Sequence, residues 1–373
     1  MQVSIVNYSE LESIALRLDP EYYHPYYLVL NDKLVETKYK KIKNIAFVTD
    51  GIHESINFDE NSNVKLVSAK APKENYFDVS GLKNISNEQN IKNPRTQLLE
   101  NDIIISSVGT IGNCAVVDKE ILPANSDRHV GIIRLQNKNF KPQFISTFML
   151  TKYGKFQSLR ESTGNVQLSL FVYKINEILV PELPINFQEI IERLCQVARI
   201  NQKNGETVYT QAQTLLLSEL GLTHWQPKHQ LTFIKNYSDT QHAERIDAEY
   251  YQPKYEEIIK AIKIYSGGWE SLEKLAHIKK CIEVGSGQYL DGGVPFVRVS
   301  NISPLEMTEE KYISNELYKK LTPKEENVPF EKSKSHQPQK GEILFSKDGT
   351  PGIAYYLKDE PQKMLPVWRH IAA

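Results

Sequence analysis

Apolar residues recur at intervals of three and four along residues 180–222, which places them on one stripe of a helix about thirty residues long. Pro181 and Pro184 precede this pattern and Gly221 ends it, as start and stop signals do. Such a helix spans roughly 45–50 Å, more than one compact domain needs. We predict a spacer helix that pairs with another long helix and separates two domains; an ordinary core helix is the alternative. The stripe consists of Ile190, Leu194, Val197, Val208 and Leu215.

Shorter apolar patterns in the first half of the chain predict β-strands. They lie at residues 64–68, 102–106, 114–117 and 129–135. The segment 102–112 predicts a hairpin that turns at Gly109. Residues 140–161 predict one helix, whose buried residues include Phe144, Phe148, Tyr153 and Phe156. The fold class is therefore α+β, with a small mixed sheet plus helices in each domain.

Three segments of the first half recur in the second half in the same order. The pairs are RLDPEYYHPYY at 17–27 with RIDAEYYQPKY at 245–255, YKKIKNIA at 39–46 with WESLEKLA at 269–276, and NDIIISSVGTIG at 101–112 with GEILFSKDGTPG at 341–352. In the first pair seven of eleven positions are identical. Two copies in one order predict two similarly folded domains.

The repeat and the long helix together set the predicted domain boundaries. We place a first domain at 1–185, the spacer helix at 186–222 and a second domain at 223–373. Tyrosines are concentrated in the opening segment of each copy, and a tyrosine can bury its ring while its hydroxyl finds a partner. We therefore expect each opening segment to anchor against its own domain or the spacer helix.

Composition excludes several classes of protein. The chain has 373 residues and a formal charge of −1, so two cores are expected and any basic surface must be local. It has no signal-like amino terminus and no run of eighteen apolar residues, so we expect no membrane association and a cytoplasmic location. Cys114, Cys195 and Cys281 are far apart and suggest reduced, partly buried residues, neither a disulfide framework nor a metal site. No nucleotide-binding, methyl-donor or metal-dependent nuclease motif is present, so we expect no cofactor and no catalytic activity.

The ordered set of motifs resembles the specificity subunit of type I DNA restriction-modification systems over nearly the full length. The resemblance rests on the repeated R-[LI]-D-x-E-Y-Y-x-P-x-Y opening, the S-x-x-G-T-x-G hairpin at 106–112, and the loop STGNVQLSL at 162–170, which is followed by the long helix. It implies two target recognition domains, each recognising half of an interrupted double-stranded DNA sequence. It also implies helices that dock methyltransferase subunits and, through them, the restriction subunit. The alternatives are the recognition part of a self-contained type IIG- or IIB-like enzyme and a protein-interaction scaffold that does not bind DNA.

Polar residues at the hairpin turns and neighbouring loops are the candidate DNA contacts, because their side chains suit base edges or phosphates. Turn chemistry and helix capping are the alternative roles for the hairpin and for the 162–169 loop. The candidates are Lys70, Ser107, Thr110, Asn113, Arg128, His129, Arg160, Asn165 and Gln167 in the first copy, and Arg298, Ser300, Asn301, Lys347 and Thr350 in the second.

The carboxyl end departs from the pattern of the first copy. After Leu365 and Pro366 the chain continues as VWRHIAA and stops. We expect the closing strand, the following helix, the glutamine-containing loop and a second spacer helix to be missing, through a frameshift that truncates the second domain. The apolar stripe then lacks a partner within the chain, so we expect a homodimer through the spacer helix.

Overall fold

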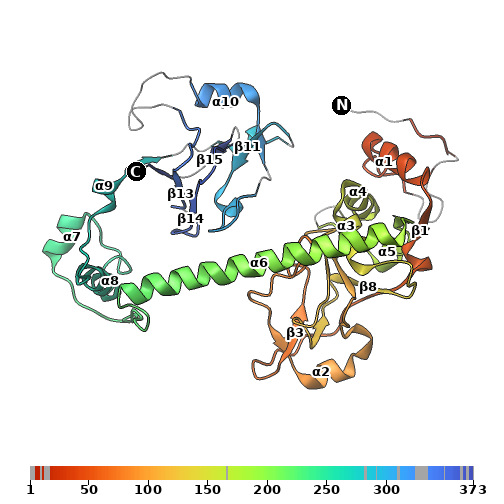
Figure 1. The fold of residues 1–373 in the computed structure, drawn as a ribbon, viewed down its shortest axis with the longest axis horizontal. Coiled ribbons are helices and arrows are strands. Elements are labelled where there is room, and N and C mark those ends of the chain that lie inside the picture. Colours follow the sequence, from red (N-terminus) through yellow and green to blue (C-terminus); the bar gives the residue numbers. More distant parts are fainter. Residues whose placement is uncertain are drawn as a thin grey trace. The chain divides into compact units, whose positions relative to one another are not determined.

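The structure is a computed structural model that describes residues 5–8, 11, 17–164, 167–280, 284–290, 292–308, 311–323, 335–347, 349–361, 364–366 and 369–372 (Figure 1). The chain divides into two compact units, Met1–Asn204 and Gly205–Ala373. Each unit is described by itself.

In its described residues, the first unit combines five short helices with nine strands. The helices are α1 (Pro25–Val35), α2 (Asn87–Lys92), α3 (Pro142–Leu150), α4 (Lys152–Glu161) and α5 (Val172–Ile175), with 3₁₀ turns η2 (Ile42–Asn44) and η3 (Pro94–Thr96). The strands are β1 (Tyr39–Lys41), β2 (Ala46–Asp50), β3 (Val64–Val67), β4 (Asn84–Ile85), β5 (Ile103–Ser106), β6 (Cys114–Val116), β7 (Ala124–Ser126), β8 (Val130–Leu135) and β9 (Leu179–Pro181). This content confirms the predicted α+β class.

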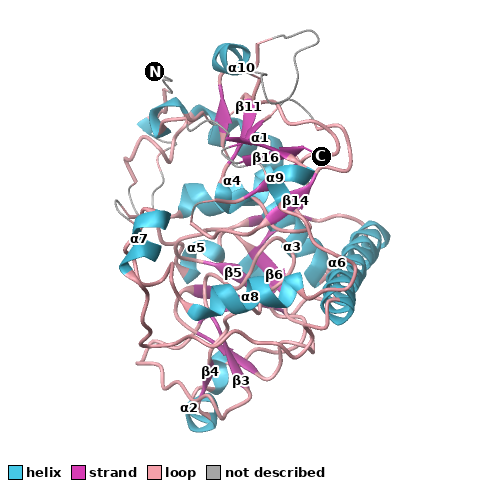
Figure 2. Ribbon diagram, turned by 90° about the vertical axis from the view of Figure 1, so that its left-hand side faces the viewer, coloured by secondary structure: helices cyan, strands magenta, loops and turns pink. Residues whose placement is uncertain are grey.

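These strands form two main sheets and one small pair. The antiparallel sheet has the order β2-β8-β5-β6, and the second sheet has the order β4-β3-β7 with β3 and β7 parallel. Strands β1 and β9 pair antiparallel. Figure 2 shows β3, β4 and α2 together at one end of the unit.

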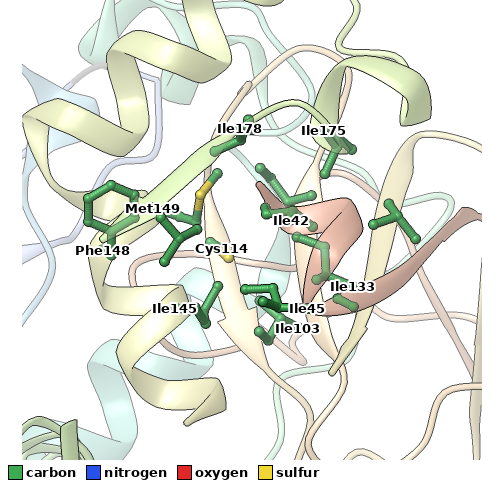
Figure 3. Packing of buried hydrophobic residues seen from close by; sticks show 14 of the residues in the cluster. Ile42, Ile45, Ile103, Cys114, Ile133, Ile145, Phe148, Met149, Ile175 and Ile178 are labelled. Carbon is green, nitrogen blue, oxygen red and sulfur yellow. The ribbon is translucent and has the colours of Figure 1, made fainter. Parts of the chain in front are cut away.

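The core lies between the antiparallel sheet and the helices α3 and α5. Ile103, Cys114 and Ile133 point from the sheet toward Ile145 and Ile175 (Figure 3). All five are fully buried because the strands carry apolar residues on this face. Burial raises the pKa of the Cys114 thiol to about 12, so Cys114 is a packing residue. Phe144, Phe148 and Phe156 are also buried, as the sequence predicts.

The predicted helix over 140–161 is two helices. Thr151 separates α3 from α4 in an extended conformation, and its hydroxyl accepts a hydrogen bond from the N–H of Gly154 at 3.5 Å. Thr151 is thus the amino-terminal cap of α4. The prediction of one helix was wrong because a cap residue overrode an apolar pattern that continues through it.

The long helix α6 (Ile185–Glu219) contains 35 residues, and Gly205 does not interrupt it (Figure 1). Its amino-terminal part is bound to the first unit. The Lys141 ammonium lies 3.2 Å from the Glu192 carboxylate, and Arg199 forms an ion pair with Asp118. A continuous helix is therefore confirmed. It begins later than residue 180, because Val180 belongs to β9.

The second unit contains the helices α7 (Tyr237–Ala243), α8 (Pro253–Lys263), α9 (Leu272–Leu275) and α10 (Asn315–Leu321), with 3₁₀ turns η4 (Ser286–Gln288) and η5 (Val299–Asn301). Its strands are β10 (His277–Lys280), β11 (Val294–Val297), β12 (Tyr312–Ile313), β13 (Ile343–Phe345), β14 (Ala354–Tyr356), β15 (Leu365–Pro366) and β16 (Arg369–Ala372). They form sheets with the orders β10-β16-β13-β14 and β12-β11-β15.

The two sheets of the second unit repeat the topology of the first. β13 and β14 form an antiparallel hairpin like β5 and β6, and β11 pairs antiparallel with β12 and parallel with β15, as β3 does with β4 and β7. The sequence repeat is therefore a repeat of architecture.

The closing strand that we expected to be absent from the second copy is present. β16 pairs antiparallel with both β10 and β13, the position that β8 occupies between β2 and β5. The prediction was wrong because a strand is held by its backbone hydrogen bonds, so a segment whose side chains differ from those of β8 still fills the gap.

Candidate nucleic-acid interface

The hairpin turn between β5 and β6 depends on two glycines with left-handed backbone angles. Gly109 has φ +77° and Gly112 has φ +87°, a region that side chains disfavour. The Gly112 N–H donates to the Ser106 carbonyl at 3.1 Å, and the Ser106 N–H donates to the Asn113 carbonyl at 2.8 Å. The predicted hairpin with its turn at Gly109 is therefore confirmed.

The turn that follows β3 holds this hairpin from one side. The Ser106 hydroxyl donates to the Ala69 carbonyl at 2.7 Å, and the Thr110 hydroxyl donates to the same oxygen at 3.1 Å. Lys70, the residue after Ala69, is exposed. Two candidate DNA contacts, Lys70 and Thr110, thus lie in adjoining turns although forty residues separate them in the sequence.

Ser107 joins the hairpin to two further loops through its backbone. Its N–H donates to the His129 carbonyl at 3.0 Å, and its carbonyl accepts the Leu170 N–H at 2.8 Å. Ser107 is itself only 7% exposed. It therefore positions the loop of Arg128 and His129 beside the loop that ends at Ser169. We call these four connected segments the loop rim: residues 68–71, 106–113, 127–129 and 167–170.

Three segments of the loop rim, 106–113, 127–129 and 167–170, line a cavity of about 360 Å³. Its lining includes four of the candidate residues, Ser107, Arg128, His129 and Gln167. The prediction did not include Asp50 and His53, which also line it. Asp50 ends β2, and it reaches the rim through the pairing of β2 with β8 and through the Ile52 N–H bond to the Ser126 carbonyl; no local sequence signal marks it.

Charge at the rim is uneven. His129 pairs with Asp127 at 3.2 Å, while Asp50 pairs with His53 at 2.6 Å and with Arg95 at 3.4 Å. Arg128 and Lys70 are exposed, and the described part of the chain offers neither an ion-pair partner. Two cations are thus available to an anionic ligand, because the acids nearby already have partners.

Three candidates of the first copy lie elsewhere or have other functions. The Arg160 guanidinium donates to the Tyr22 carbonyl at 3.0 Å and stacks 4.2 Å from the centre of the Tyr22 ring, away from the rim cavity. Asn113 contributes its carbonyl to the hairpin turn. Asn165 lies outside the described residues. Arg160 therefore binds the opening segment, a role that its sequence position does not show.

The second unit presents an equivalent hairpin turn. Gly349 and Gly352 have φ +70° and +102°, and the Gly352 N–H donates to the Ser346 carbonyl at 3.2 Å, as Gly112 does to Ser106. A Cβ added to Gly349 would lie 3.7 Å from a Val299 methyl, so this turn adjoins η5. The exposed candidates Ser300 and Thr350 flank that contact.

The remaining candidates of the second copy are less accessible. Asn301 is 2% exposed, and its side-chain oxygen accepts hydrogen bonds from the Arg298 backbone N–H at 3.1 Å and from the Arg298 Nε at 3.2 Å. Asn301 thus stabilises η5, and we leave it out of the proposed surface. Lys347 and Arg298 are both half-buried beside the turns.

The fold and the rim define a two-unit α+β protein in which one architecture occurs twice. No protein-family model matches the sequence, and no curated protein matches it. No helix among the described residues is long and apolar enough to cross a membrane, and no group of three potential metal ligands occurs among them.

Solved structures similar to the chain over 90% of its length are S subunits of type I restriction-modification systems. The S subunit from M. genitalium has 11% identity and a TM-score of 0.38, with 71% of that chain covered. The HsdS subunit from Thermoanaerobacter tengcongensis has 13% identity and a TM-score of 0.32, with 74% covered. The type IIG restriction endonuclease BpuSI matches 47% of this chain and 28% of its own at 6% identity and a TM-score of 0.37. Because these TM-scores are below 0.5, we base no functional inference on them.

Proposed function

We propose that the chain is a sequence-specific double-stranded DNA recognition subunit of a type I restriction-modification complex, and that each unit recognises one half of a bipartite target. The observation that carries this proposal is the loop rim, where the exposed Arg128 lines the same cavity as Gln167 and the exposed Lys70 lies in the turn that is bonded to the hairpin. Cations suit phosphates, and a glutamine amide suits the edge of adenine. The second unit repeats the hairpin but has Lys347 where the first has Ser107, as expected for two different half-sites.

The size of the rim explains why two units are needed. A groove-facing element contacts roughly three or four base pairs, which is too short a target for useful specificity. A second unit at a set distance adds a second short target in another major groove. In this proposal α6 sets the distance, and partner subunits supply methylation and cleavage.

Docking of those partners, or of a second copy, is assigned to the apolar stripe of α6. Its five residues, named above, are between 45% and 72% exposed. Exposed apolar side chains at helical spacing are typical of a helix that pairs with another. We infer that methyltransferase subunits or the same stripe of a second copy cover it, and that the restriction subunit joins through the methyltransferase.

Duplex binding by the purified full-length protein tests the proposal. Selection from a random duplex library is expected to enrich one or two short motifs. Arg128→Ala should weaken binding to all duplexes and lower the salt slope by about 1, since a phosphate contact is lost. Gln167→Ala should relax the preference at one base pair by about 1–3 kcal/mol, since a base contact is lost. Lys138→Ala is the matched control. This exposed lysine follows the carboxyl end of β8, whereas Arg128 precedes its amino end.

Two results would contradict the proposal. Binding that does not depend on salt, or a selection that enriches no motif, would favour a protein-interaction scaffold. Methylation or cleavage of DNA by the purified chain alone would favour a self-contained enzyme.

A further inference from the structure

The opening segment of the first copy binds the carboxyl end of α4. Arg17 donates to the Arg160 carbonyl at 3.0 Å and to the Ser162 carbonyl at 3.2 Å, which satisfies acceptors that a helix end leaves open. The Tyr22 hydroxyl donates to the Glu161 carboxylate at 3.1 Å. Tyr22, on which Arg160 stacks, is 7% exposed. The expected anchoring of the opening segment to its own domain is therefore confirmed.

An aromatic contact extends this interface along the helices. Tyr27 on α1 stacks on Phe156 on α4, with ring centres 6.1 Å apart. Phe156 precedes Arg160 by four residues, so both lie on one face of α4. Three residues of the opening segment, Arg17, Tyr22 and Tyr27, therefore recognise an aromatic–x–x–x–Arg–Glu–Ser helix end.

The second copy repeats Arg17, Asp19 and Tyr23 as Arg245, Asp247 and Tyr251 in the same local geometry. Arg245 pairs with Asp247 at 2.6 Å, as Arg17 pairs with Asp19 at 2.7 Å. The Tyr251 hydroxyl donates to the Arg245 carbonyl at 2.7 Å, the counterpart of a 2.9 Å bond from Tyr23 to Arg17.

The aromatic arrangement is repeated as well. Arg245 stacks 4.4 Å from the ring centre of Tyr250, against 4.5 Å for Arg17 and Tyr22. The rings of Tyr250 and Tyr251 meet edge to face at 4.9 Å, as do those of the first copy. Arg245 and Tyr250 thus already have the arrangement of Arg17 and Tyr22, while the Tyr255 hydroxyl donates to the Glu249 carboxylate at 2.7 Å.

The opening segment of the second copy is exposed where that of the first is covered. The Arg245 side chain is 51% exposed against 11% for Arg17, and Tyr250 is 46% exposed against 7% for Tyr22. Arg245, Tyr250 and Tyr255, the counterparts of Arg17, Tyr22 and Tyr27, line one cavity of about 740 Å³. We call it the second-copy cavity. Its walls also carry Asp239, Asp247, Glu249 and Glu256.

We propose that the second-copy cavity binds the carboxyl end of a cationic helix that has an aromatic residue four positions before an Arg-Glu-Ser end. Arg245 would donate to the last carbonyls, Tyr250 would take the arginine on its ring and donate to the glutamate, and Tyr255 would stack on the aromatic residue.

Charge complementarity supports this ligand. The cavity wall has four carboxylates; Asp247, Glu249 and Glu256 pair with Arg245, Lys254 and Lys235, so one carboxylate remains in excess. The segment 152–162, which fills the equivalent place in the first unit, has three cations and one carboxylate. A cationic helix end therefore suits an acidic cavity.

A peptide of residues 151–163 is the probe. A lactam between Lys155 and a glutamate that replaces Leu159 keeps it helical, and the interface is spared because Leu159 is exposed and Lys155 pairs with Glu74. Fluorescence anisotropy with the full-length protein should show saturable binding. Arg245→Ala should weaken it about tenfold or more, because charge-assisted hydrogen bonds are lost. Lys263→Ala on α8, outside the cavity, should not.

Further variants separate recognition from folding. Tyr250→Phe removes one hydroxyl and should weaken binding several-fold, and a peptide with Arg160→Ala should bind about tenfold more weakly to the unaltered protein. Thermal unfolding of the Arg245→Ala protein should be unchanged, since that side chain is half exposed. The proposal is overturned if the peptide does not saturate the protein at about 1 mM, or if Arg245→Ala and Lys263→Ala bind it equally.

Discussion

Asp102, the residue before β5, shows how a single buried charge supports the hairpin. Its carboxylate is 1% exposed and accepts hydrogen bonds from Arg134 at 2.8 and 2.6 Å. It also accepts the Leu99 N–H at 2.8 Å. Because Arg134 lies on β8, this ion pair ties the start of the hairpin to the central strand.

Arg134→Ala should destabilise the first unit by about 3–5 kcal/mol, because it leaves the Asp102 carboxylate buried with no cation. Urea unfolding followed by circular dichroism measures the loss. Lys119→Ala is the control: its ion pair with Glu100 is exposed and 3.9 Å long, so the change should cost less than about 1 kcal/mol. Equal midpoints for the two variants would show that the Asp102 pair contributes little.

Individual residue roles were predicted well only where local chemistry decides them. Gly109 and Gly112 predict a turn because few other residues tolerate a left-handed backbone, and the structure has that turn. Arg160 was predicted as a phosphate contact, yet it binds Tyr22, 138 positions away in the sequence. Asp50 was missed for the same reason: strand pairing brings it to the rim. Long-range partners leave no local pattern.

At the scale of elements, apolar periodicity predicted which helices and strands exist better than it predicted where they begin and end. It located α6, because the apolar repeat of this helix is long. It also located the β5–β6 hairpin, because an apolar run there ends at a glycine turn. It did not predict the break at Thr151, because threonine is compatible with both a helix interior and a cap. It also missed the pairing of β1 with β9, which joins three-residue strands from the two ends of the first unit.

The exposed stripe of α6 makes an element-scale prediction. If it pairs with another helix, Leu194→Glu combined with Val197→Glu should shift the full-length protein from dimer to monomer in analytical ultracentrifugation, because charges oppose burial of the stripe. Gln202→Glu on the same helix is the control, as it adds a charge outside the stripe. A protein that is monomeric before substitution would leave a methyltransferase subunit as the only proposed occupant and would contradict homodimerisation.

For the whole molecule, the repeat means that one scaffold occurs twice with different residues at its turns. The hairpin and both sheets recur, while residues at the turns differ, so one scaffold presents two sets of side chains. The opening segments repeat their internal geometry but differ in what covers them. The two units thus share their sheets and hairpin. They differ in the residues at the turns and in the exposure of their opening segments.

If α6 sets the distance between two DNA contacts, its length must be matched to the helical repeat of DNA. Eleven residues are three turns of a helix with 3.67 residues per turn, so inserting eleven or twenty-two after Gly205 preserves the phase of the stripe. Twenty-two residues add about 33 Å, close to the B-DNA turn of about 34 Å. The selected half-sites should then move apart by about ten base pairs and remain on one face of the duplex.

Eleven residues add only about 17 Å, half a turn, which directs the second unit toward the opposite face of the duplex. That variant should lose the bipartite motif and keep single half-sites, even though its stripe is as continuous as in the longer variant. Twenty-two residues inserted instead between Gln226 and Pro227, beyond the end of α6, should not lengthen the separation by a full turn, because they do not extend the helix. Selection from a random duplex library distinguishes the three proteins, and an unchanged separation in the twenty-two-residue helical variant would show that α6 does not set the distance.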